Sequence, residues 1–248
     1  MLQNFESLVL IWLGIGFITF ITLLKIPAPY GKFSKTNWGP MIPSKLGWIV
    51  MEIISPLALL YFFLNGNIEK TPTNITFVSF WTLHYFNRSV IYPLRQNNPA
   101  QMPLLIAVLA FLFNVMNGYI NGTYFGSIQE YSAEYMSNWN FIVGVCLFII
   151  GAYINIKSDN ILLSLRSKSG EYKIPEGFMF RYVSFPNYLG EILEWMAFAL
   201  MTWSLAGLSF MIWTMANLVP RAIKGHQWYH DKFESYPKNR KAIFPFII

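Results

Sequence analysis

The sequence predicts an all-α integral membrane protein, a bundle of seven transmembrane helices with its N-terminus outside and its C-terminus in the cytoplasm. Of the 248 residues, 54% are hydrophobic and only 12% are charged, which is about half the charged share of a typical soluble domain. The apolar residues gather in long runs, and about 17–25 of them in a row span a bilayer as a helix. The basic residues gather in alternate loops, as in membrane proteins of fixed orientation.

The apolar runs follow one another along what we expect to be a single domain over residues 1–248. Each is about as long as a membrane span requires, except the last, which is shorter. Pro56 inside the second run predicts a kink. Glycines recur every fourth residue at the end of the fourth run and just after it, at Gly118, Gly122 and Gly126. This spacing favours close approach of a neighbouring helix. The runs are Phe5–Leu24, Leu46–Leu64, Ile75–Leu94, Met102–Tyr119, Trp139–Ile156, Tyr188–Leu205, and Leu208 to about Ile223.

Charge placement favours an odd number of spans. With the N-terminus outside, every Lys and Arg except Lys70 falls on the cytoplasmic side. Two cytoplasmic segments, about residues 157–186 and 221–248, are longer than a connection needs, and we expect both to contribute to a binding site. Orientation and contact with anionic membrane lipid account for the net charge of +6, so no nucleic-acid partner is indicated.

Polar residues inside the apolar runs predict a site for a polar ligand at membrane depth, because such groups are costly there unless they face a protein-lined cavity. Asn187, Glu191 and Glu194 recur at i, i+4 and i+7 in the sixth run and share one helix face. Glu52 lies in the second run, and the segment His84-Tyr85-Phe86-Asn87-Arg88 lies in the third. Structural pairing of this segment's arginine with an acid of the bundle is the alternative explanation.

Other features of the sequence carry less chemistry. Cys146 is expected to be a small buried hydrophobe, and one cysteine and three histidines without ligand spacing predict no metal site. Gly14-Ile15-Gly16 lacks the third glycine and the strand of a dinucleotide fingerprint, so no Rossmann fold is indicated. Asn74-Ile75-Thr76 and Asn121-Gly122-Thr123 match the glycosylation pattern, but such short matches arise often by chance.

Several segments together carry a family resemblance. The chain from Phe233 to Phe246 reads Phe-Glu-Ser-Tyr-Pro-Lys-Asn-Arg-Lys-Ala-Ile-Phe-Pro-Phe. Upstream segments match in the same order: His84-Tyr85-Phe86-Asn87-Arg88, Asn155-Ile156-Lys157-Ser158-Asp159, Tyr172-Lys173-Ile174-Pro175, Asn187-Tyr188-Leu189-Gly190-Glu191, Trp203-Ser204-Leu205, Arg221-Ala222 and Trp228-Tyr229. From about Gly47 to the C-terminus, the chain resembles the steroid 5α-reductase (3-oxo-5α-steroid 4-dehydrogenase) family.

The resemblance implies NADPH-dependent reduction of the C4–C5 double bond of a 3-oxo-Δ4-steroid. Hydride adds to the carbon β to the ketone, so negative charge develops on the ketone oxygen and donors aimed at that oxygen stabilise the transition state. By resemblance, Tyr85 and Glu52 are the catalytic pair that binds this ketone. A phenol with a pKa of about 10 keeps its proton at neutral pH, whereas Glu52 donates only when it is protonated.

The resemblance also implies the cofactor and steroid residues. Arg166 and Arg221 suit phosphates, whereas Asn187 and Glu191 suit amide and hydroxyl groups. Trp195 is expected to wall the steroid slot, with a lipid-facing position as the alternative. By resemblance, the residues that hold NADPH are Asn155, Asp159, Arg166, Tyr172, Asn187, Glu191, Arg221 and Tyr229.

The sequence departs from the family at one point and leaves some alternatives open. Many relatives carry two histidines where this chain has Gly225-His226, so the role of His226 is open. A related reductase of a polyprenal or an enoyl-thioester is the main alternative enzyme. A transporter or lipid-binding protein would use the same buried acids, but no inverted repeat supports it. The membrane is either a bacterial inner membrane or the endoplasmic reticulum.

Overall fold

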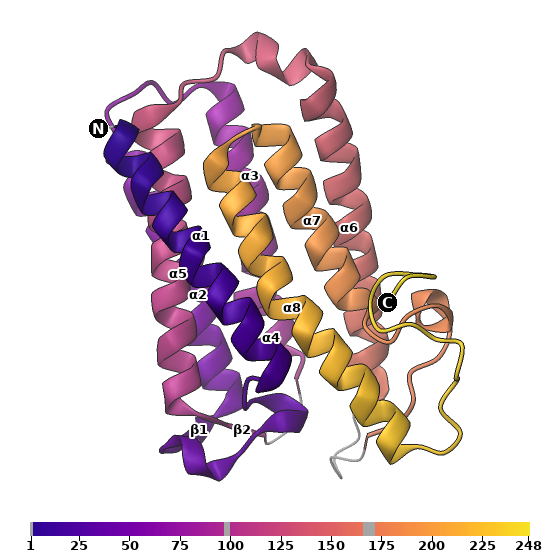
Figure 1. The fold of residues 1–248 in the computed structure, drawn as a ribbon. Coiled ribbons are helices and arrows are strands. Elements are labelled where there is room, and N and C mark those ends of the chain that lie inside the picture. The colour runs from indigo at the N-terminus through magenta and orange to yellow at the C-terminus, as the bar shows by residue number, and fades with distance from the viewer. Residues whose placement is uncertain (1, 97–99, 166–171) are drawn as a thin grey trace. The chain divides into compact units, whose positions relative to one another are not determined.

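The computed structural model describes residues 2–96, 100–165 and 172–248, and this described part is mostly helical (Figure 1). Within it, each of the seven apolar runs lies mostly in helix, which confirms the helical part of the prediction. The long helices are α1 (Leu2–Lys25), α2 (Ser44–Leu64), α3 (Pro72–Phe86), α5 (Leu104–Thr123), α6 (Trp139–Leu165), α7 (Pro186–Thr202) and α8 (Leu205–Lys232).

Shorter elements extend or join the long helices. A π-helix, η3, continues α3 into α4, and a second π-helix, η4, continues α5. Two short strands, β1 and β2, pair antiparallel with Met41 opposite Pro103. The short elements are η1 (Gly31–Phe33), η2 (Thr36–Trp38), β1 (Met41–Pro43), η3 (Asn87–Ile91), α4 (Tyr92–Leu94), β2 (Gln101–Pro103), η4 (Tyr124–Ile128), η5 (Ala133–Ser137) and η6 (Phe178–Arg181).

Three predicted boundaries were wrong. The fourth helix starts at Leu104 and not at Met102, which pairs with Ile42 in the strand ladder. The sixth ends at Thr202, because Trp203 adopts a left-handed conformation with a φ of 46°. The last helix is the longest among the described residues: it includes Pro220 and continues to Lys232, so the first part of the predicted basic tail is helical. Its start is capped by Ser204, whose hydroxyl accepts from the Gly207 amide at 3.0 Å.

Four helices among the described residues are long and apolar enough to cross a membrane: α1, α2, α5 with η4, and α6. Large apolar side chains stay exposed on them, such as Phe17 at 66% and Leu57 at 53%, as expected for surfaces that face lipid. Cys146 is also exposed, on α6, so the expectation that it is buried was wrong. The count of seven spans and the orientation of the termini stay predictions.

The chain contains two compact units. The first consists of Met1–Val9 and Ala28–Ile142, and the second of Leu10–Pro27 and Val143–Ile248. Helix α1 therefore contributes its first residues to one unit and the rest to the other. The single domain over residues 1–248 stays a prediction.

In the first unit, glycines on α5 allow close contact with α2, as their spacing predicted. A Cβ added at Gly118 would lie 2.7 Å from the Cβ of Ala58, and one at Gly122 would lie 2.5 Å from the carbonyl oxygen of Leu59. Such distances are too short for ordinary packing, so only glycine permits this approach. The contact brings polar side chains of α5 within reach of the α2 backbone.

The segment after η4 is held by Asn74 at the start of α3. Its side-chain nitrogen donates to the carbonyl oxygens of Phe125 and Gln129 at 2.8 and 2.9 Å. Its side-chain oxygen accepts from the backbone N–H of Tyr131 at 3.0 Å. Asn74 is fully buried, as is Asn121, so neither side chain is available as a glycosylation acceptor. Burial raises the pKa of the Tyr131 phenol, which lies outside the candidate spans.

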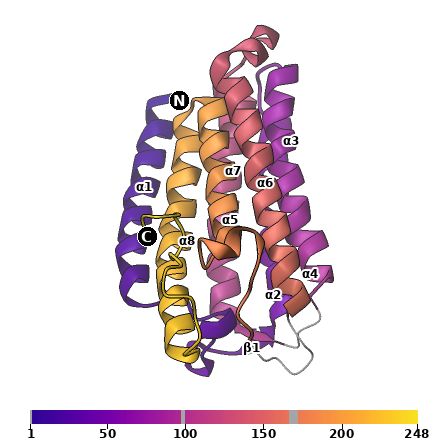
Figure 2. The ribbon, with the colours of Figure 1, turned by 90° about the vertical axis from the view of Figure 1, so that its right-hand side faces the viewer.

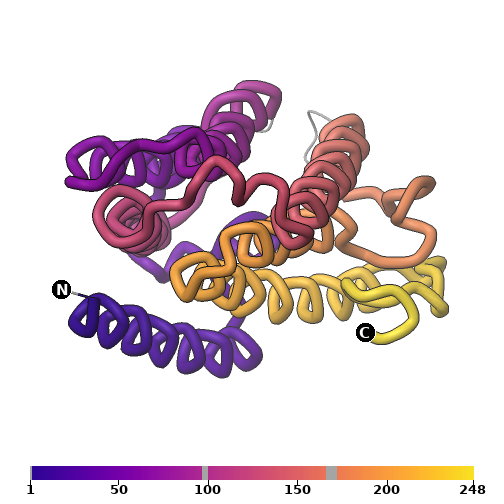
Figure 3. The backbone as a smooth tube through the Cα atoms, turned by 90° about the horizontal axis from the view of Figure 1, so that it is seen from above, coloured from indigo at the N-terminus to yellow at the C-terminus, as the bar shows by residue number. Residues whose placement is uncertain are grey.

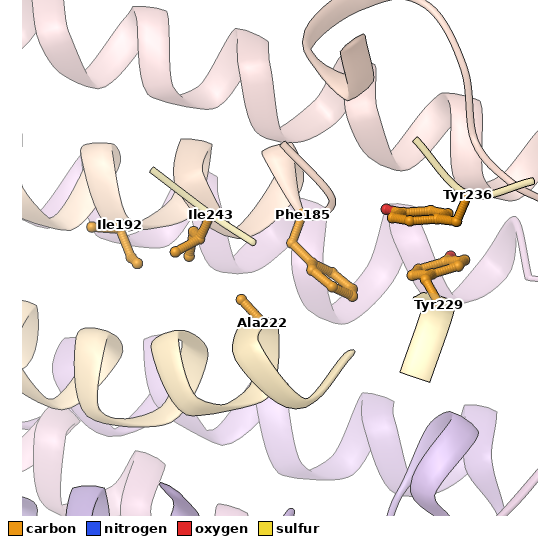
Figure 4. Packing of buried hydrophobic residues seen from close by; sticks show 6 residues of the cluster. All are labelled: Phe185, Ile192, Ala222, Tyr229, Tyr236 and Ile243. Atoms are coloured by element: carbon orange, nitrogen blue, oxygen red, sulfur yellow. The ribbon is translucent and has the colours of Figure 1, made fainter. Parts of the chain in front are cut away.

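In the second unit, α7 and α8 pack side by side (Figure 3), and the chain after α8 folds back beside that helix (Figure 2). The returning chain is tied to the segment before α7, because the Ser184 amide donates to the Lys241 carbonyl at 2.8 Å. Figure 4 shows the buried cluster around this return, in which Ile243 lies near Ile192 and Ala222. The aromatic tail is thus part of the core of the second unit.

Candidate active-site residues

Tyr85 and the α2 backbone beside Glu52 are joined through a residue of α5. The Tyr85 side chain is 4% exposed, and its hydroxyl donates to the amide oxygen of Asn114 at 3.2 Å. The Asn114 amide nitrogen donates to the Met51 carbonyl oxygen at 2.6 Å. Glu52 follows Met51 directly and is half-buried. The structure thus places Tyr85 in a hydrogen-bonded chain that ends one residue before Glu52.

The backbone around Tyr85 is also fixed. The π-helix η3 starts two residues after Tyr85, and its Ser89 hydroxyl donates to the Tyr85 carbonyl oxygen at 2.7 Å. Single π-turns within α-helices occur often at functional sites. The Trp81 ring stacks on the Tyr85 ring with centroids 5.6 Å apart, and the Trp81 indole donates to the Ser55 hydroxyl at 3.1 Å. Tyr85 is therefore held from both sides along the chain, by Trp81 before it and by Ser89 after it.

Arg88, one helical turn after His84, lies among aromatic rings. Its side chain is 9% exposed, and its guanidinium carbon lies 5.0 Å from the Trp48 ring centroid and 5.2 Å from that of Tyr92. Such contacts stabilise a buried cation. The Trp48 indole also donates to the Arg88 carbonyl oxygen at 3.1 Å, so Arg88 anchors the π-helix to α2.

In the second unit, three of the predicted cofactor residues form one buried network. The Asn155 amide donates to the Asn187 carbonyl oxygen at 2.9 Å, and the Asn187 side-chain amide donates to a carboxylate oxygen of Asp159 at 3.0 Å. All three side chains are at most 8% exposed. The amide oxygen of Asn187 is buried and has no hydrogen-bond partner among the described residues. A buried acceptor in this state is costly and suits a ligand that brings a donor.

Two glycines bring α6 and α7 close enough for this network. A Cβ on Gly190 would lie 2.5 Å from the Asn155 backbone nitrogen, and one on Gly151 would lie 2.7 Å from the Gly190 carbonyl oxygen. The helices therefore touch through their backbones at this level. Because asparagine and aspartate have short side chains, their contact across the interface depends on this approach.

The other predicted cofactor residues of the second unit lie on α7, on α8 or beside it. Glu191 is half-buried on α7, and the Arg221 Nε donates to the Tyr188 hydroxyl at 3.0 Å. Tyr229 is buried on α8, whereas Tyr172 is 37% exposed. Arg166, the predicted phosphate ligand, lies outside the described residues.

Trp195 occupies the core of the second unit. Its side chain is 1% exposed and contacts the Phe210 ring edge-on at 4.5 Å between centroids, with Phe198 at 5.7 Å. The lipid-facing alternative was therefore wrong. A role in walling a steroid slot stays a prediction.

Comparison with known proteins identifies the family. The family model for 3-oxo-5-alpha-steroid 4-dehydrogenase matches residues 100–248. Steroid 5-alpha-reductase DET2 of Solanum lycopersicum is 43% identical over 248 residues, covering 98% of this chain and 96% of the relative. 3-oxo-5-alpha-steroid 4-dehydrogenase 1 of Rattus norvegicus is 37% identical over 94% of this chain and 91% of its own length. The protein of the same name from Homo sapiens is 35% identical, covering 94% and 92%.

The chain belongs to the 3-oxo-5α-steroid 4-dehydrogenase family. It is therefore an oxidoreductase, as the sequence motifs predicted, and its apolar helices make it a membrane enzyme. Over the described residues, no group of three or more His, Cys, Asp or Glu side chains is arranged to hold a metal ion.

The reductase contains two hydrogen-bonded groups that the sequence did not predict, one around Asn114 and one around His226, whose role the sequence left open. Asn114 was overlooked because it lies in an apolar run, although Asn117 and Asn121 follow at helical spacing and marked a polar face. The second group surrounds His226, whose Nδ1 lies 2.6 Å from the Ser184 hydroxyl, itself 2.7 Å from the Tyr236 hydroxyl. This contact gives His226 a part in holding the returning tail.

Proposed function

We propose that the enzyme reduces the C4–C5 double bond of 3-oxo-Δ4-steroids to the 5α-dihydro products and uses NADPH as the hydride donor. The observation that carries the proposal is the similarity to enzymes named steroid 5-alpha-reductase or 3-oxo-5-alpha-steroid 4-dehydrogenase over nearly the whole chain, at 35–43% identity. The contacts of Tyr85 and Asn187 support separate parts of the reaction.

The ketone end of the steroid is assigned to Tyr85 and Glu52. Reduction builds negative charge on the ketone oxygen, and a neutral phenol can donate to it. Tyr85 is suited to this because its ring and backbone each have a fixed partner, so its oxygen is held in place and only the hydroxyl, which donates to Asn114 in the structure, has to turn toward the ketone. A preorganised donor of this kind contributes about 10²–10³-fold in rate. Glu52, when protonated, supplies the second donor.

The nicotinamide end of the cofactor is assigned to the Asn155–Asp159–Asn187 network. The buried amide oxygen of Asn187 can accept from the carboxamide N–H of a nicotinamide, while Asp159 holds the Asn187 amide nitrogen and so fixes which end of the side chain faces the ligand. These residues therefore fit the proposed cofactor. Bound there, NADPH supplies the hydride that carbon 5 of the steroid receives.

The phosphate end of the cofactor is assigned to arginines. Arg221 lies on α8 with its Nε on the Tyr188 hydroxyl, and a guanidinium binds two phosphate oxygens where a lysine offers a point charge. Arg166 is assigned a phosphate from the sequence alone. Glu191, Tyr172 and Tyr229 complete the proposed set. Trp195 belongs to the steroid slot in this proposal.

Activity measurement separates the proposed function from its alternatives. Purified protein is mixed with NADPH and progesterone, and the fall in cofactor absorbance is followed while the product is identified by mass spectrometry. We expect 5α-dihydroprogesterone, formed one-for-one with NADPH consumed. Oxidation of NADPH by a polyprenal or an enoyl-thioester, with none by progesterone or testosterone, would contradict the steroid assignment.

Kinetics of variants test the nicotinamide assignment separately. Asn187→Ala removes both the buried acceptor and the donor to Asp159. We expect the KM for NADPH to rise up to about tenfold, as for loss of a neutral hydrogen bond worth about 0.5–1.5 kcal/mol. Turnover should fall as well, because a misplaced nicotinamide misplaces the hydride. A normal KM for NADPH together with a normal turnover in Asn187→Ala would remove Asn187 from the cofactor site.

A further inference from the structure

We infer that Asn114 is a positioning residue for steroid reduction: it holds the Tyr85 hydroxyl, through a side-chain amide fixed on the α2 backbone, where the steroid ketone must bind. The inference rests on the proposed role of Tyr85. Asn114 itself was not among the residues that the sequence motifs marked.

The orientation of the Asn114 amide is determined by its two partners. The Met51 carbonyl oxygen can only accept, so the amide nitrogen must face it, and that contact is 2.6 Å long. The amide oxygen must then face Tyr85, 3.2 Å away. An amide oxygen can only accept, so the Tyr85 hydroxyl is the donor in this pair. Asn114 therefore fixes the direction in which the Tyr85 hydroxyl donates before the steroid arrives.

The geometry of α5 explains why asparagine can make both contacts. Gly118, one turn after Asn114, allows α5 to approach α2 until an added Cβ would lie 2.9 Å from the Ser55 carbonyl oxygen. At this separation the short asparagine side chain reaches the α2 backbone directly. Asn114 is 4% exposed, so water does not compete for its bonds and the arrangement is rigid.

The consequence for catalysis follows from the single proton of a phenol. On binding, the steroid ketone accepts the hydrogen bond that the Tyr85 hydroxyl had donated to Asn114, and a small rotation of the hydroxyl is enough if the Tyr85 oxygen is already in place. Without Asn114 the Tyr85 oxygen is less well placed, and a misplaced donor costs most in the transition state, where the bond to the ketone oxygen is strongest. Turnover should fall more than steroid affinity.

The test compares Asn114→Ala with Asn121→Ala, a matched control. Asn121 is a fully buried asparagine on the same helix, and its amide donates to the Asn117 carbonyl oxygen at 3.1 Å. We expect Asn114→Ala to lower kcat for progesterone about 10–100-fold with the steroid KM changed by less than about threefold. Asn121→Ala should keep kcat within about twofold of the wild type. Equal kcat values for the two variants would overturn the inference.

A double-mutant cycle asks whether Asn114 acts through Tyr85. If it does, Asn114→Ala has no further effect on kcat once Tyr85→Phe has removed the hydroxyl. Effects that multiply would mean that Asn114 acts by another route, and the inference would fail while the role of Tyr85 stood. A Tyr85→Phe variant with normal kcat would instead overturn the proposed ketone site itself.

A second variant covers the case in which Asn114→Ala does not fold. Asn114→Asp keeps the side-chain volume, and its neutral form can still donate to the Met51 carbonyl and accept from Tyr85. Its ionised form cannot donate to Met51. We therefore expect kcat of Asn114→Asp to fall with rising pH, relative to the wild type. A pH profile that parallels the wild type, at any level of activity, would contradict the inference.

Discussion

Gly190→Ala tests how far the cofactor network depends on the contact between α6 and α7. The added Cβ would lie 2.5 Å from the Asn155 nitrogen, whereas ordinary contact begins at 3.4 Å, so the helices must separate by about 0.9 Å. The nearest atoms are backbone, and no side chain can move aside. Overpacking of this kind costs about 1–3 kcal/mol, which exceeds the gain of about 1 kcal/mol that alanine brings to a helix.

A shift of this size also lengthens the hydrogen bonds from Asn155 and Asn187, now 2.9 and 3.0 Å, beyond useful range. We expect a lower thermal midpoint in detergent and a KM for NADPH raised about tenfold or more, measured at saturating steroid. Gly14→Ala is the control, because a Cβ there meets nothing within 4 Å. If Gly190→Ala matched Gly14→Ala in both measurements, the reasoning about the helix contact would be refuted.

Three further predictions concern the ketone site, the topology and the response to pH. Tyr85→Phe should lower turnover about 10²–10³-fold with little change in steroid affinity. Glu52→Gln should also lower turnover, because an amide donates from a different position. Unchanged turnover in both variants would contradict the assignment of these two residues to the ketone. A cysteine placed after Ile248, in a Cys146→Ala background, should resist an impermeant thiol reagent in intact cells, and labelling without lysis would overturn the orientation. Burial raises the pKa of the Tyr131 phenol, so an unfolded chain ionises at a pH of about 10 while the folded protein does not. The thermal midpoint should therefore decline above that pH, less so in Tyr131→Phe, and an identical decline in both would contradict this.

The positions of the helices were predictable because apolar runs and glycine spacing are local signals. The spacing of Gly118 and Gly122 predicts a close contact with a neighbouring helix, and the structure shows that this helix is α2. Helix ends were less predictable: the left-handed turn at Trp203 and the capping bond of Ser204 depend on how α7 meets α8. The strand pairing of Met102 with Ile42 joins segments far apart in the sequence, and an apolar residue before a helix gives no sign of it.

The motifs marked some residues that the structure joins by hydrogen bonds, while the roles of these residues stay predictions. Asn155, Asp159 and Asn187 were named from their segments, and the structure joins them in one network. No motif marked Asn114, because its contacts with Tyr85 and Met51 come from two other helices. Burial could not be assigned from residue type either: Cys146 is exposed on α6, whereas Trp195 is enclosed.

The transfer of hydride from the cofactor to the steroid tests the central claim most directly. The protein is incubated with progesterone and NADPH that carries deuterium at both positions of nicotinamide carbon 4, and the product is analysed by mass spectrometry and NMR. The proposed function predicts 5α-dihydroprogesterone with one deuterium on carbon 5 and a solvent proton on carbon 4. A product without deuterium at carbon 5, or no dihydro steroid while NADPH reduces another lipid, would contradict it.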